Sequence, residues 1–523
     1  MSTNRIISVS TLSVDDSKGS PVVSQVDIEN QFGATEVHFD ALHDTESTKE
    51  SDVFIVDWDG PEDPENPMNW SYRRKWAATV VVSAFAFITP VTSSIIAPAS
   101  LQLTEHFGIG NSTELACVTS IFVLAYAFGP LLLGPLSELY GRSRVLQLAN
   151  LWYLAWNIGC GLSQNTSQIM AFRFLAGLGG SAPLSIGGGV LADCWKPEER
   201  GKAIALYSVA PVLGPVIGPV VGAWIAQKST WRWVFYSTSI ADAVIQVLGL
   251  FFLKESFAPL LLARKANELR KNPTEKAVRA REIRSKFDNA DREWKSTMAR
   301  ALRRPLMLFI HEPIVQLLGV YFCFVYGLLY IFLTTMPSIF ELVYRETVGI
   351  AGLNYFALGV GLVGAAQLNA LMLDKLYKHL MQKHGGEGKP EYRLPSMIPG
   401  TLLTPIGLLI SGWTAKRSIH WVIPDIGIAL VGAGTILNFI SIQTYVVDAF
   451  SMHAASALAA ITFLRSLAGF GFPLFAPSMY TALGYGKGNS ILAAVGIVVG
   501  CPAPFILWFY GERIRKASKF ARH

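Results

Sequence analysis

Of the ionisable residues inside long apolar stretches of this chain, three are of special interest. They are Arg173 in the stretch 168–192, Asp242 in 233–253 and Arg465 in 454–476. An arginine in the middle of a bilayer costs about 2.5–3.5 kcal/mol, so each is expected to face a partner or a wet interior. A carboxylate held between burial and a nearby cation can exchange protons. We therefore expect all three residues to take part in coupling protons or substrate, with a structural ion pair as the alternative.

Glycines and prolines alternate with a regular spacing in the stretch 207–224. The repeating residues are Gly214, Pro215, Gly218, Pro219 and Gly222. At helical pitch the glycines form a flat stripe that another helix can approach closely. The prolines remove backbone donors and bend the helix, which membrane helices tolerate when their neighbours satisfy the freed carbonyls. A tightly packed helix without a special function is the alternative interpretation.

A short connection between two apolar stretches carries charges that could switch partners. Its residues of interest are Gly134, Glu138, Gly141, Arg142 and Arg144. Gly141 permits a turn with positive φ. The charged side chains can pair with other charges or with helix ends. A pair that forms in only one conformation would act as a cytoplasmic gate. The alternative is a topology signal with a weak surface salt bridge.

Polar and aromatic residues within the apolar stretches are candidates for lining a cavity. We single out Tyr207, Gln246, Tyr330, Asn438 and Gln443. A cavity with a few polar groups and many aromatic rings would suit a bulky amphiphile. Simple packing is the alternative for most of these residues.

The elements that must position these residues are membrane helices. Of the 523 residues, 51% are hydrophobic and 16% are charged, whereas a soluble domain has about 25% charged residues. Twelve stretches of the length needed to span a bilayer, about 20 residues, can be placed. They lie near 76–98, 115–133, 145–162, 168–192, 203–226, 233–253, 314–336, 349–373, 396–414, 421–447, 454–476 and 488–511. We predict an all-α integral membrane protein with two six-helix bundles related by an axis along the membrane normal.

This arrangement predicts five regions. They are a disordered cytosolic tail (1–57), an N-terminal six-helix bundle (58–253), a central cytoplasmic loop (254–313), a C-terminal six-helix bundle (314–511) and a cytosolic C-terminal tail (512–523). The N-terminal region leads into no long apolar segment, so we expect no cleaved signal peptide.

The distribution of lysine and arginine predicts the sidedness. Short connections on the side of the termini hold most of these residues, so both termini are expected in the cytoplasm. The sequons at Asn111 and Asn165 then face the outside, and they are candidate glycosylation sites. Both lie within a few residues of a predicted span, which disfavours their modification.

Several function classes are disfavoured. The net charge of +6 is explained by basic connections beside the spans, so no nucleic acid is expected as a partner. The five cysteines are scattered and have no metal-ligand or disulfide spacing. No Walker A sequence is present, which disfavours ATP-driven transport. No nucleophile and base are paired in the spans, so we expect no enzyme, no metal and no cofactor, with a proton gradient as the energy source.

Together these motifs resemble the fungal twelve-helix drug/proton antiporter branch of the major facilitator superfamily. Residues 134–144 resemble the family's charged loop, with Glu138 where aspartate is usual. Arg173 with Gly177 resembles the fourth-helix motif, whose arginine is implicated in proton coupling. The stretch from Gly214 to Gly222 resembles the antiporter motif, which favours efflux over uptake. The resemblance runs from about Trp58 to the C-terminus.

The resemblance implies a proton-coupled exporter of a drug, toxin, polyamine or secondary metabolite in the plasma membrane. Its expected partners are a small-molecule substrate, protons and the lipid bilayer, and we expect a monomer. The alternatives are a proton-driven importer on the same fold and a non-transporting membrane receptor.

Overall fold

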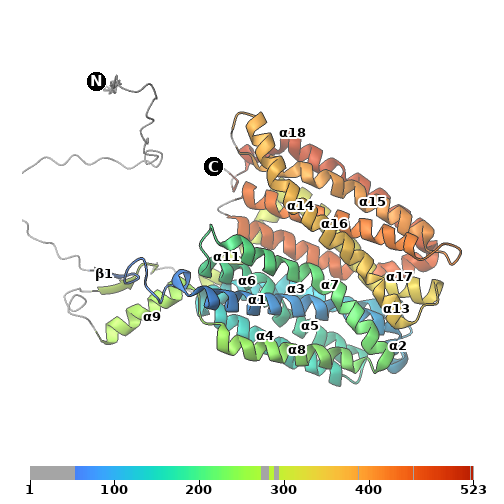
Figure 1. Ribbon diagram of the computed structural model, residues 1–523, viewed down its shortest axis with the longest axis horizontal. Helices are drawn as coiled ribbons and strands as arrows, with labels where there is room; N and C mark the ends of the chain where they lie inside the picture. Colours follow the sequence, from blue (N-terminus) through green and yellow to red (C-terminus); the bar gives the residue numbers. More distant parts are fainter. Residues whose placement is uncertain are drawn as a thin grey trace, which may run out of the picture. The chain divides into compact units, whose positions relative to one another are not determined.

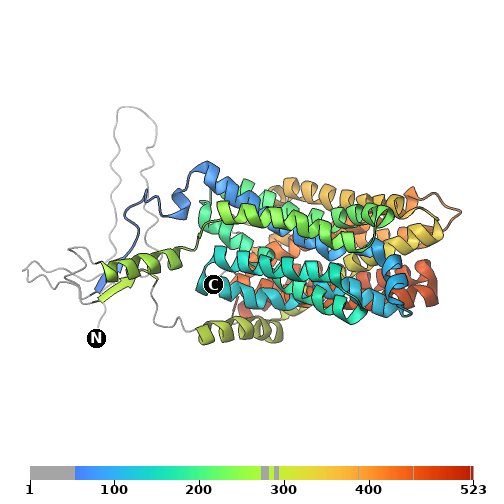
Figure 2. The same ribbon diagram turned by 90° about the horizontal axis from the view of Figure 1, so that it is seen from below.

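The computed structural model describes residues 53–272, 282–287, 294–386, 388–450, 453–518 and 520–521. Within these ranges the chain is almost entirely helical, and long helices lie side by side along one direction (Figures 1 and 2). The predicted tail falls largely on residues 1–52, which lie outside the described residues.

Helices of the first half of the chain run back and forth along the bundle. They are α1 (Tyr72–Ser94), α2 (Ser100–Phe107), α3 (Ser112–Tyr140), α4 (Arg142–Leu162), α5 (Thr166–Gly180), α6 (Ala182–Cys194), α7 (Arg200–Lys228) and α8 (Arg232–Phe252). Short 3-10 turns at Pro67–Asn69 (η1) and Ala97–Ala99 (η2) precede α1 and α2. We call the end of the bundle at which α2 lies the α2 end (Figure 1).

Helices of the second half form the other side of the bundle. They are α11 (Trp294–His311), α12 (Pro313–Pro337), α13 (Val348–Leu353), α14 (Tyr355–Lys383), α15 (Met397–Thr414), α16 (Val422–Ala449), α17 (Ala454–Gly500) and α18 (Pro502–Ala517). A π-helical segment (η3, Ser338–Val343) follows α12, and a 3-10 segment (η4, Pro390–Ser396) precedes α15.

The number of membrane-crossing helices agrees with the prediction. Among the described residues, ten helical segments are long and apolar enough to cross a membrane. Helix α4 is a further helix of 21 residues. The segment Ala454–Ala517 contains a break at Gly484, where φ is +73°. Counting α4 and dividing the long segment at Gly484 gives twelve segments, which is consistent with the predicted number. The all-α membrane architecture is confirmed.

A two-stranded parallel sheet outside the spans joins the segment before α1 to the central loop. Strand β1 (Val53–Val56) pairs in parallel with β2 (Glu282–Ser285), and Val53 lies opposite Glu282. Helix α9 (Ala258–Lys271) lies beside this pair, at the end of the bundle that we call the α9 end (Figures 1 and 2). The predicted tail, 1–57, was therefore too long, because residues 53–56 are hydrogen-bonded to the central loop.

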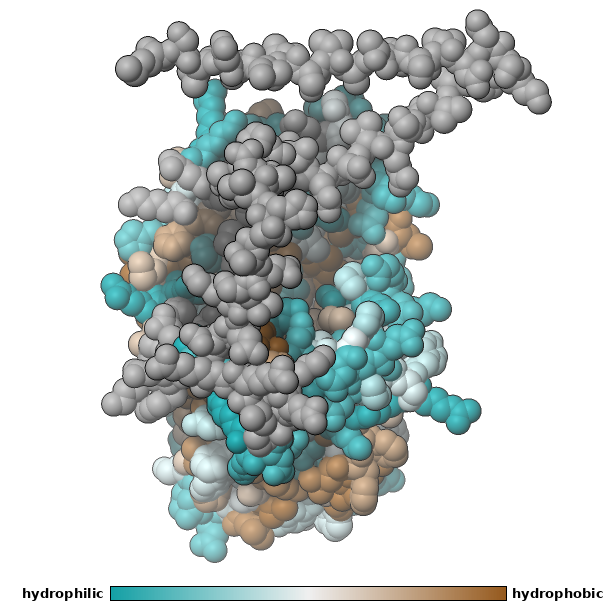
Figure 3. Space-filling model, turned by 90° about the vertical axis from the view of Figure 1, so that its left-hand side faces the viewer, coloured by the Kyte–Doolittle hydropathy of each residue, from teal (hydrophilic) through white to brown (hydrophobic). Residues whose placement is uncertain are grey.

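Lysine and aspartate side chains hold the same two segments together. Lys265 Nζ, on α9, lies 2.7 Å from Asp59 Oδ1 and 3.7 Å from Asp63 Oδ2. Asp63 also accepts hydrogen bonds from the backbone N–H groups of Asp59 and Glu65. Hydrophilic side chains gather on this end of the molecule, and hydrophobic ones lie along its lower flank (Figure 3).

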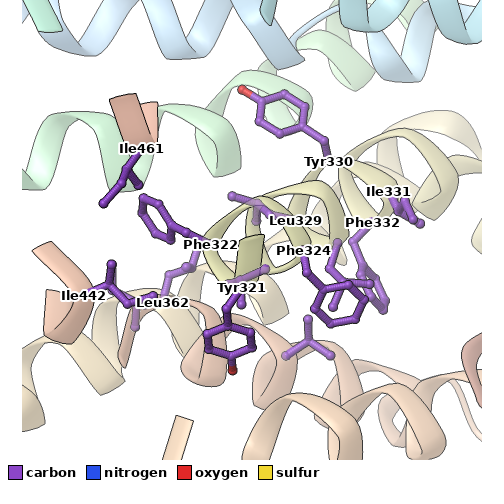
Figure 4. Close-up of a cluster of buried hydrophobic side chains, with 14 of the residues drawn as sticks. Tyr321, Phe322, Phe324, Leu329, Tyr330, Ile331, Phe332, Leu362, Ile442 and Ile461 are labelled. Carbon is purple, nitrogen blue, oxygen red and sulfur yellow. The ribbon is translucent and has the colours of Figure 1, made fainter. Parts of the chain in front are cut away.

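The largest buried apolar cluster lies in the second half of the chain and centres on α12. Phe322, Phe324, Ile331 and Phe332 of this helix are buried in it (Figure 4). Tyr330 points away from the other labelled side chains, and its hydroxyl is directed toward helices of the first half. Helix α12 therefore packs its own bundle with most of its surface and reaches the other bundle through Tyr330.

Candidate functional site

Arg173 lies in the interior of the first bundle and has no carboxylate partner among the residues that the structure describes. Its side chain is 1% exposed, and its Nη2 donates to the carbonyl oxygens of Ser93, at 3.1 Å, and Thr119, at 2.9 Å. The Nε and Nη1 groups have no hydrogen-bond partner within the described part of the chain. The guanidinium lies 5.4 Å from the ring centre of Phe122 and 5.8 Å from that of Phe235. Backbone carbonyls and ring faces therefore stabilise part of the charge, and two donors remain unused.

Asp242 lies on α8 in a different environment. Its Oδ2 accepts a hydrogen bond of 3.0 Å from Asn150 of α4, whose Nδ2 also donates to Gln246 at 2.9 Å. The other carboxylate oxygen is buried and has no partner among the described residues. The sequence left open whether Asp242 touches an arginine. No ion pair joins it to Arg173 or Arg465 in the ranges that the structure describes.

The partners of Asp242 belong to a row of polar residues that sequence analysis missed. Asn157 of α4 donates to the hydroxyls of Thr238 and Ser239 on α8, at 2.9 and 2.8 Å. Gln147 donates to the carbonyl oxygen of Gly249 at 3.0 Å. The signal was present: positions 143, 147, 150 and 157 hold polar residues spaced by four, three and seven, which places them on one helix face.

A polar contact between the two bundles lies next to Arg173. Tyr330 of α12 and Ser93 of α1 are joined by a hydrogen bond of 3.3 Å between their hydroxyls. The backbone carbonyl of the same serine accepts from Arg173. On the neighbouring residue of α1, the hydroxyl of Thr92 lies 2.6 Å from that of Tyr153 on α4. Hydroxyl groups therefore line the path from the buried arginine to the second bundle.

Arg465 of α17 lies on the other side of this contact, among aromatic rings. Its guanidinium is 5.0 Å from the ring centre of Tyr326, 5.2 Å from Phe439 and 5.5 Å from Phe322. The rings of Tyr326 and Tyr330 are themselves 5.1 Å apart. The structure therefore brings two of the three predicted coupling residues to the contact between bundles and places Asp242 elsewhere, between α4 and α8.

The glycine stripe of α7 packs against α1. A methyl group at Gly218 would lie 2.6 Å from the carbonyl oxygen of Val91, and one at Gly214 would lie 2.7 Å from Pro90. A methyl group at Gly222 would overlap the carbonyl oxygen of Ile95. The close helix approach expected from the sequence is present, and it lies within one bundle.

Another face of α7 meets the second bundle. Positions Gly352 and Gly359, on α13 and α14, lie against Ala223 and Val216 of α7. Near the α2 end, the side chain of Gln227 accepts a hydrogen bond of 2.7 Å from the backbone N–H of Gly349.

The half of α7 toward the α9 end has much less cover. Residues 204–206 and 208–209 are all exposed, which is more than one face of the helix. Helix α7 therefore contacts the second bundle near the α2 end and is more exposed toward the α9 end.

The charged loop between α3 and α4 forms a network that differs from the expected gate. Arg142 Nε lies 3.3 Å from Asp193 Oδ2 at the end of α6, and its backbone N–H donates to Glu255 at 2.8 Å. Gly141 has a φ of +102°, the positive value expected for this turn. Glu138 and Arg144 are exposed. No ion pair joins Glu138 to Arg142 in the described ranges. Asp193 belongs to the same bundle as Arg142, and Glu255 follows α8, the last helix of that bundle.

The second bundle carries a matching network. Arg393, in the 3-10 segment η4, lies 3.0 Å from Asp448 at the end of α16 and 3.1 Å from Asp374 of α14. Nearby, Arg515 of α18 donates hydrogen bonds from Nη2 to both carboxylate oxygens of Glu391, at 3.0 Å to Oε1 and 2.9 Å to Oε2. In both halves a loop arginine is thus paired with an aspartate at the end of the bundle's fourth span. This similarity fits the predicted relation between the two halves.

The five predicted cavity residues are scattered. Tyr207 donates to the carbonyl oxygen of Pro183 at 2.8 Å. Gln246 and Asn438 are buried between helices, α4 and α8 in one case and α15 and α16 in the other. Gln443 is half-buried on α16. Among these five residues, only Tyr330 has a described hydrogen bond across the contact between bundles, and its partner is Ser93.

The two sequon asparagines cap helices at the α2 end. Asn111 Oδ1 accepts from the N–H of Thr113 at 2.9 Å, and Asn165 Oδ1 accepts from Gln168 at 2.9 Å. Asparagine is preferred at this position because its side chain satisfies a free N–H group of the first turn.

Comparison with known proteins gives the family. A model of the Major Facilitator Superfamily matches residues 82–473. The efflux pump vrtL of Penicillium aethiopicum is 46% identical over 470 residues, which cover 90% of this chain and 92% of that protein. The MFS-type transporter penM of Penicillium rubens is 44% identical over 474 residues, which cover 90% and 91%.

Solved structures share the fold. The xylose transporter XylE of E. coli, in a partially occluded inward open conformation, superposes with a TM-score of 0.62 at 16% identity and covers 84% of this chain and 98% of its own. A bacterial homologue of the human lysosomal transporter Spinster gives a TM-score of 0.58 at 14% identity, with 85% and 98% covered. The matched family and the relatives named above are transporters and not enzymes. The chain is therefore a multi-pass membrane transporter that belongs to the major facilitator superfamily.

Proposed function

We propose that this protein exports a small organic compound from the cytoplasm across the plasma membrane in exchange for protons. The observation that carries the proposal is the polar centre at the contact between bundles, where Arg173 and Tyr330 meet at Ser93. A buried charge inside a membrane protein marks a substrate or ion pathway more often than a packing element. The efflux pump vrtL, at 46% identity, supports the export direction.

The two bundles would rock about this centre. Helix α7 contacts the second bundle near the α2 end and is more exposed toward the α9 end. This difference supports a state in which the space between the bundles is open at the α9 end. With both termini in the cytoplasm, this state faces inward and can load its substrate. The networks of Arg142 and Arg393 would then hold each bundle together as a unit while the bundles move.

Asp242 is the proposed proton carrier. It is fully buried, and one of its oxygens has no partner among the described residues. Asn150 can donate a hydrogen bond to the ionised or to the protonated carboxyl group, so both forms fit the site. Arg173 would couple this event to the substrate through α1. We further propose that the protein acts as a monomer without a cofactor.

The test is efflux of labelled metabolites and drugs from proteoliposomes under an imposed pH gradient. We expect gradient-driven movement by the wild type, and loss of the gradient dependence in Asp242→Asn and Arg173→Ala. Glu138→Gln, which neutralises an exposed carboxylate, should retain it. Movement that ignores the gradient would indicate facilitated diffusion and refute antiport. Uptake coupled to proton entry would indicate an importer, and absence of any movement would favour a receptor.

A further inference from the structure

Arg465 has the features of a binding group without its ligand. Its side chain is half-buried, and its Nε and Nη1 are buried without a hydrogen-bond partner in the described ranges. The rings of Phe322, Tyr326 and Phe439 lie 5.0–5.5 Å from the guanidinium. They come from α12 and α16, so two neighbouring helices frame one cation. Ring faces attract a cation but accept no strong hydrogen bond, so the donors of Arg465 stay available.

Arg173 adds a second positive charge across the bundle contact. The two arginines are connected by close neighbours. The rings of Tyr326 and Tyr330 lie 5.1 Å apart, Tyr330 is hydrogen-bonded to Ser93, and the carbonyl of Ser93 accepts from Arg173. Arg173 is fully buried and bound to backbone carbonyls, so it supplies positive potential without direct contact. Arg465 is more accessible and is the group that can touch a ligand.

Within the described part of the chain, no carboxylate is paired with either arginine of this centre. No ion pair with Arg173 or Arg465 exists among the described residues, and the nearest candidate from the sequence, Asp242, is engaged with Asn150 between α4 and α8. Isolated charges in a low-dielectric interior are strongly unfavourable unless they are paired. A neutral ligand would leave both cations uncompensated, whereas an anion would satisfy the free donors of Arg465 with charge-assisted hydrogen bonds.

We propose that the transported compound is an organic anion. Its carboxylate pairs with the guanidinium of Arg465, and its flat apolar body lies against the rings of Tyr326 and Phe439, which are only partly buried. This inference rests on the proposed function for its biological meaning, because it names the substrate class of the same site. The chemistry of binding, however, can be tested separately from transport.

The experiment measures binding of matched acids and amides to the purified full-length protein in nanodiscs. The probes are naphthalene-2-carboxylate and biphenyl-4-carboxylate, each compared with its uncharged primary amide by calorimetry. We expect the wild type to prefer at least one acid over its amide by about tenfold or more. Arg465→Met should abolish the preference, because methionine keeps much of the length and loses the charge. Arg417→Met, which removes an exposed arginine at the α2 end, should retain it.

A second variant and a stability measurement separate binding from folding. Arg465→Lys keeps the charge but loses the planar pair of donors, so we expect the preference to weaken without disappearing. The melting temperature of Arg465→Met without ligand should equal or exceed that of the wild type, because the variant removes an uncompensated charge. Equal binding of acid and amide by the wild type in both pairs, or an unchanged preference in Arg465→Met, would overturn the proposal.

The outcomes also distinguish this proposal from the proposed function. Gradient-driven export of neutral compounds together with equal binding of acid and amide would support the proposed export function and refute the proposed anion site. A clear preference for the acid without any transport in proteoliposomes would support the proposed anion site and refute the proposed export function.

Discussion

For substitutions in the glycine stripe of α7, the structure predicts whether the free energy of unfolding rises or falls. In Gly222→Ala the new methyl group would overlap the carbonyl oxygen of Ile95, a backbone atom directly after the C-terminal end of α1 that cannot rotate away. Overpacking of this kind costs about 1–3 kcal/mol, and the rigid neighbour places it near the upper end. Alanine is favoured over glycine inside a helix by about 1 kcal/mol. The expected net loss is therefore about 2 kcal/mol.

A matched control uses a glycine of the same kind without a neighbour. Gly364 lies inside α14, is exposed, and has nothing within 4 Å of its added methyl group. Gly364→Ala should therefore leave stability unchanged or raise it by up to about 1 kcal/mol. Gly218→Ala should lie between the two, because one of its close neighbours, Ser94 Oγ, can rotate while the other, the carbonyl oxygen of Val91, cannot.

The assay is thermal unfolding of the purified protein, with gradient-driven efflux measured alongside. For a unit of about 150–250 residues, 1 kcal/mol corresponds to about 2–4 °C, so Gly222→Ala should lower the melting temperature by about 4–8 °C. Efflux should fall as well, because α1 carries Ser93 and is forced away from α7. If Gly222→Ala melts no lower than Gly364→Ala, the inference that the stripe fixes the α1–α7 contact is wrong.

Two further predictions concern charges at the α9 end. Asp193→Asn should lower the free energy of unfolding by about 1–3 kcal/mol, because it leaves the partly buried Arg142 without its carboxylate partner. Glu138→Gln should change the free energy of unfolding by less than about 0.5 kcal/mol. Thermal unfolding compares the two variants, and equal effects would contradict the network around Arg142. Although burial acts to raise it, the pKa of Asp63 is lowered by backbone N–H donors and by Lys265. The stability from this carboxylate is therefore present above its unfolded pKa of about 3.9 and is lost as the pH falls through the lower folded value. Cleavage of the wild type by pepsin near residue 63, divided by cleavage of an unstructured peptide at the same pH, should then rise only below about pH 4. A ratio that does not change with pH would refute this.

Apolar stretches of the right length made the spans predictable from the sequence. Arg173 and Arg465 could also be recognised, because each stands alone in a long apolar stretch, and the cost of a charge in lipid does not depend on the detailed fold. The spacing of Gly214, Gly218 and Gly222 similarly predicted a close helix contact, since helical pitch alone places them on one face.

The partners of these residues could not be predicted in the same way. Glu138 and Arg142 are four residues apart and were expected to act together. However, the turn at Gly141 directs the backbone N–H of Arg142 to Glu255, more than one hundred residues later. The expected tail likewise ended too late, since β1 has only four residues and is stabilised by pairing with β2.

The sequence by itself determined the class of the protein: membrane spans, buried charges and a glycine-lined helix follow from local composition and helical periodicity. The tertiary structure alone decided which charges meet. It placed Asp242 against Asn150, away from both arginines, and it brought Arg465 among three rings from α12 and α16. The physical reason is that spans of similar composition can pack in many rotations about their axes. Only the complete set of interhelical contacts selects one of them and fixes which side chains face each other.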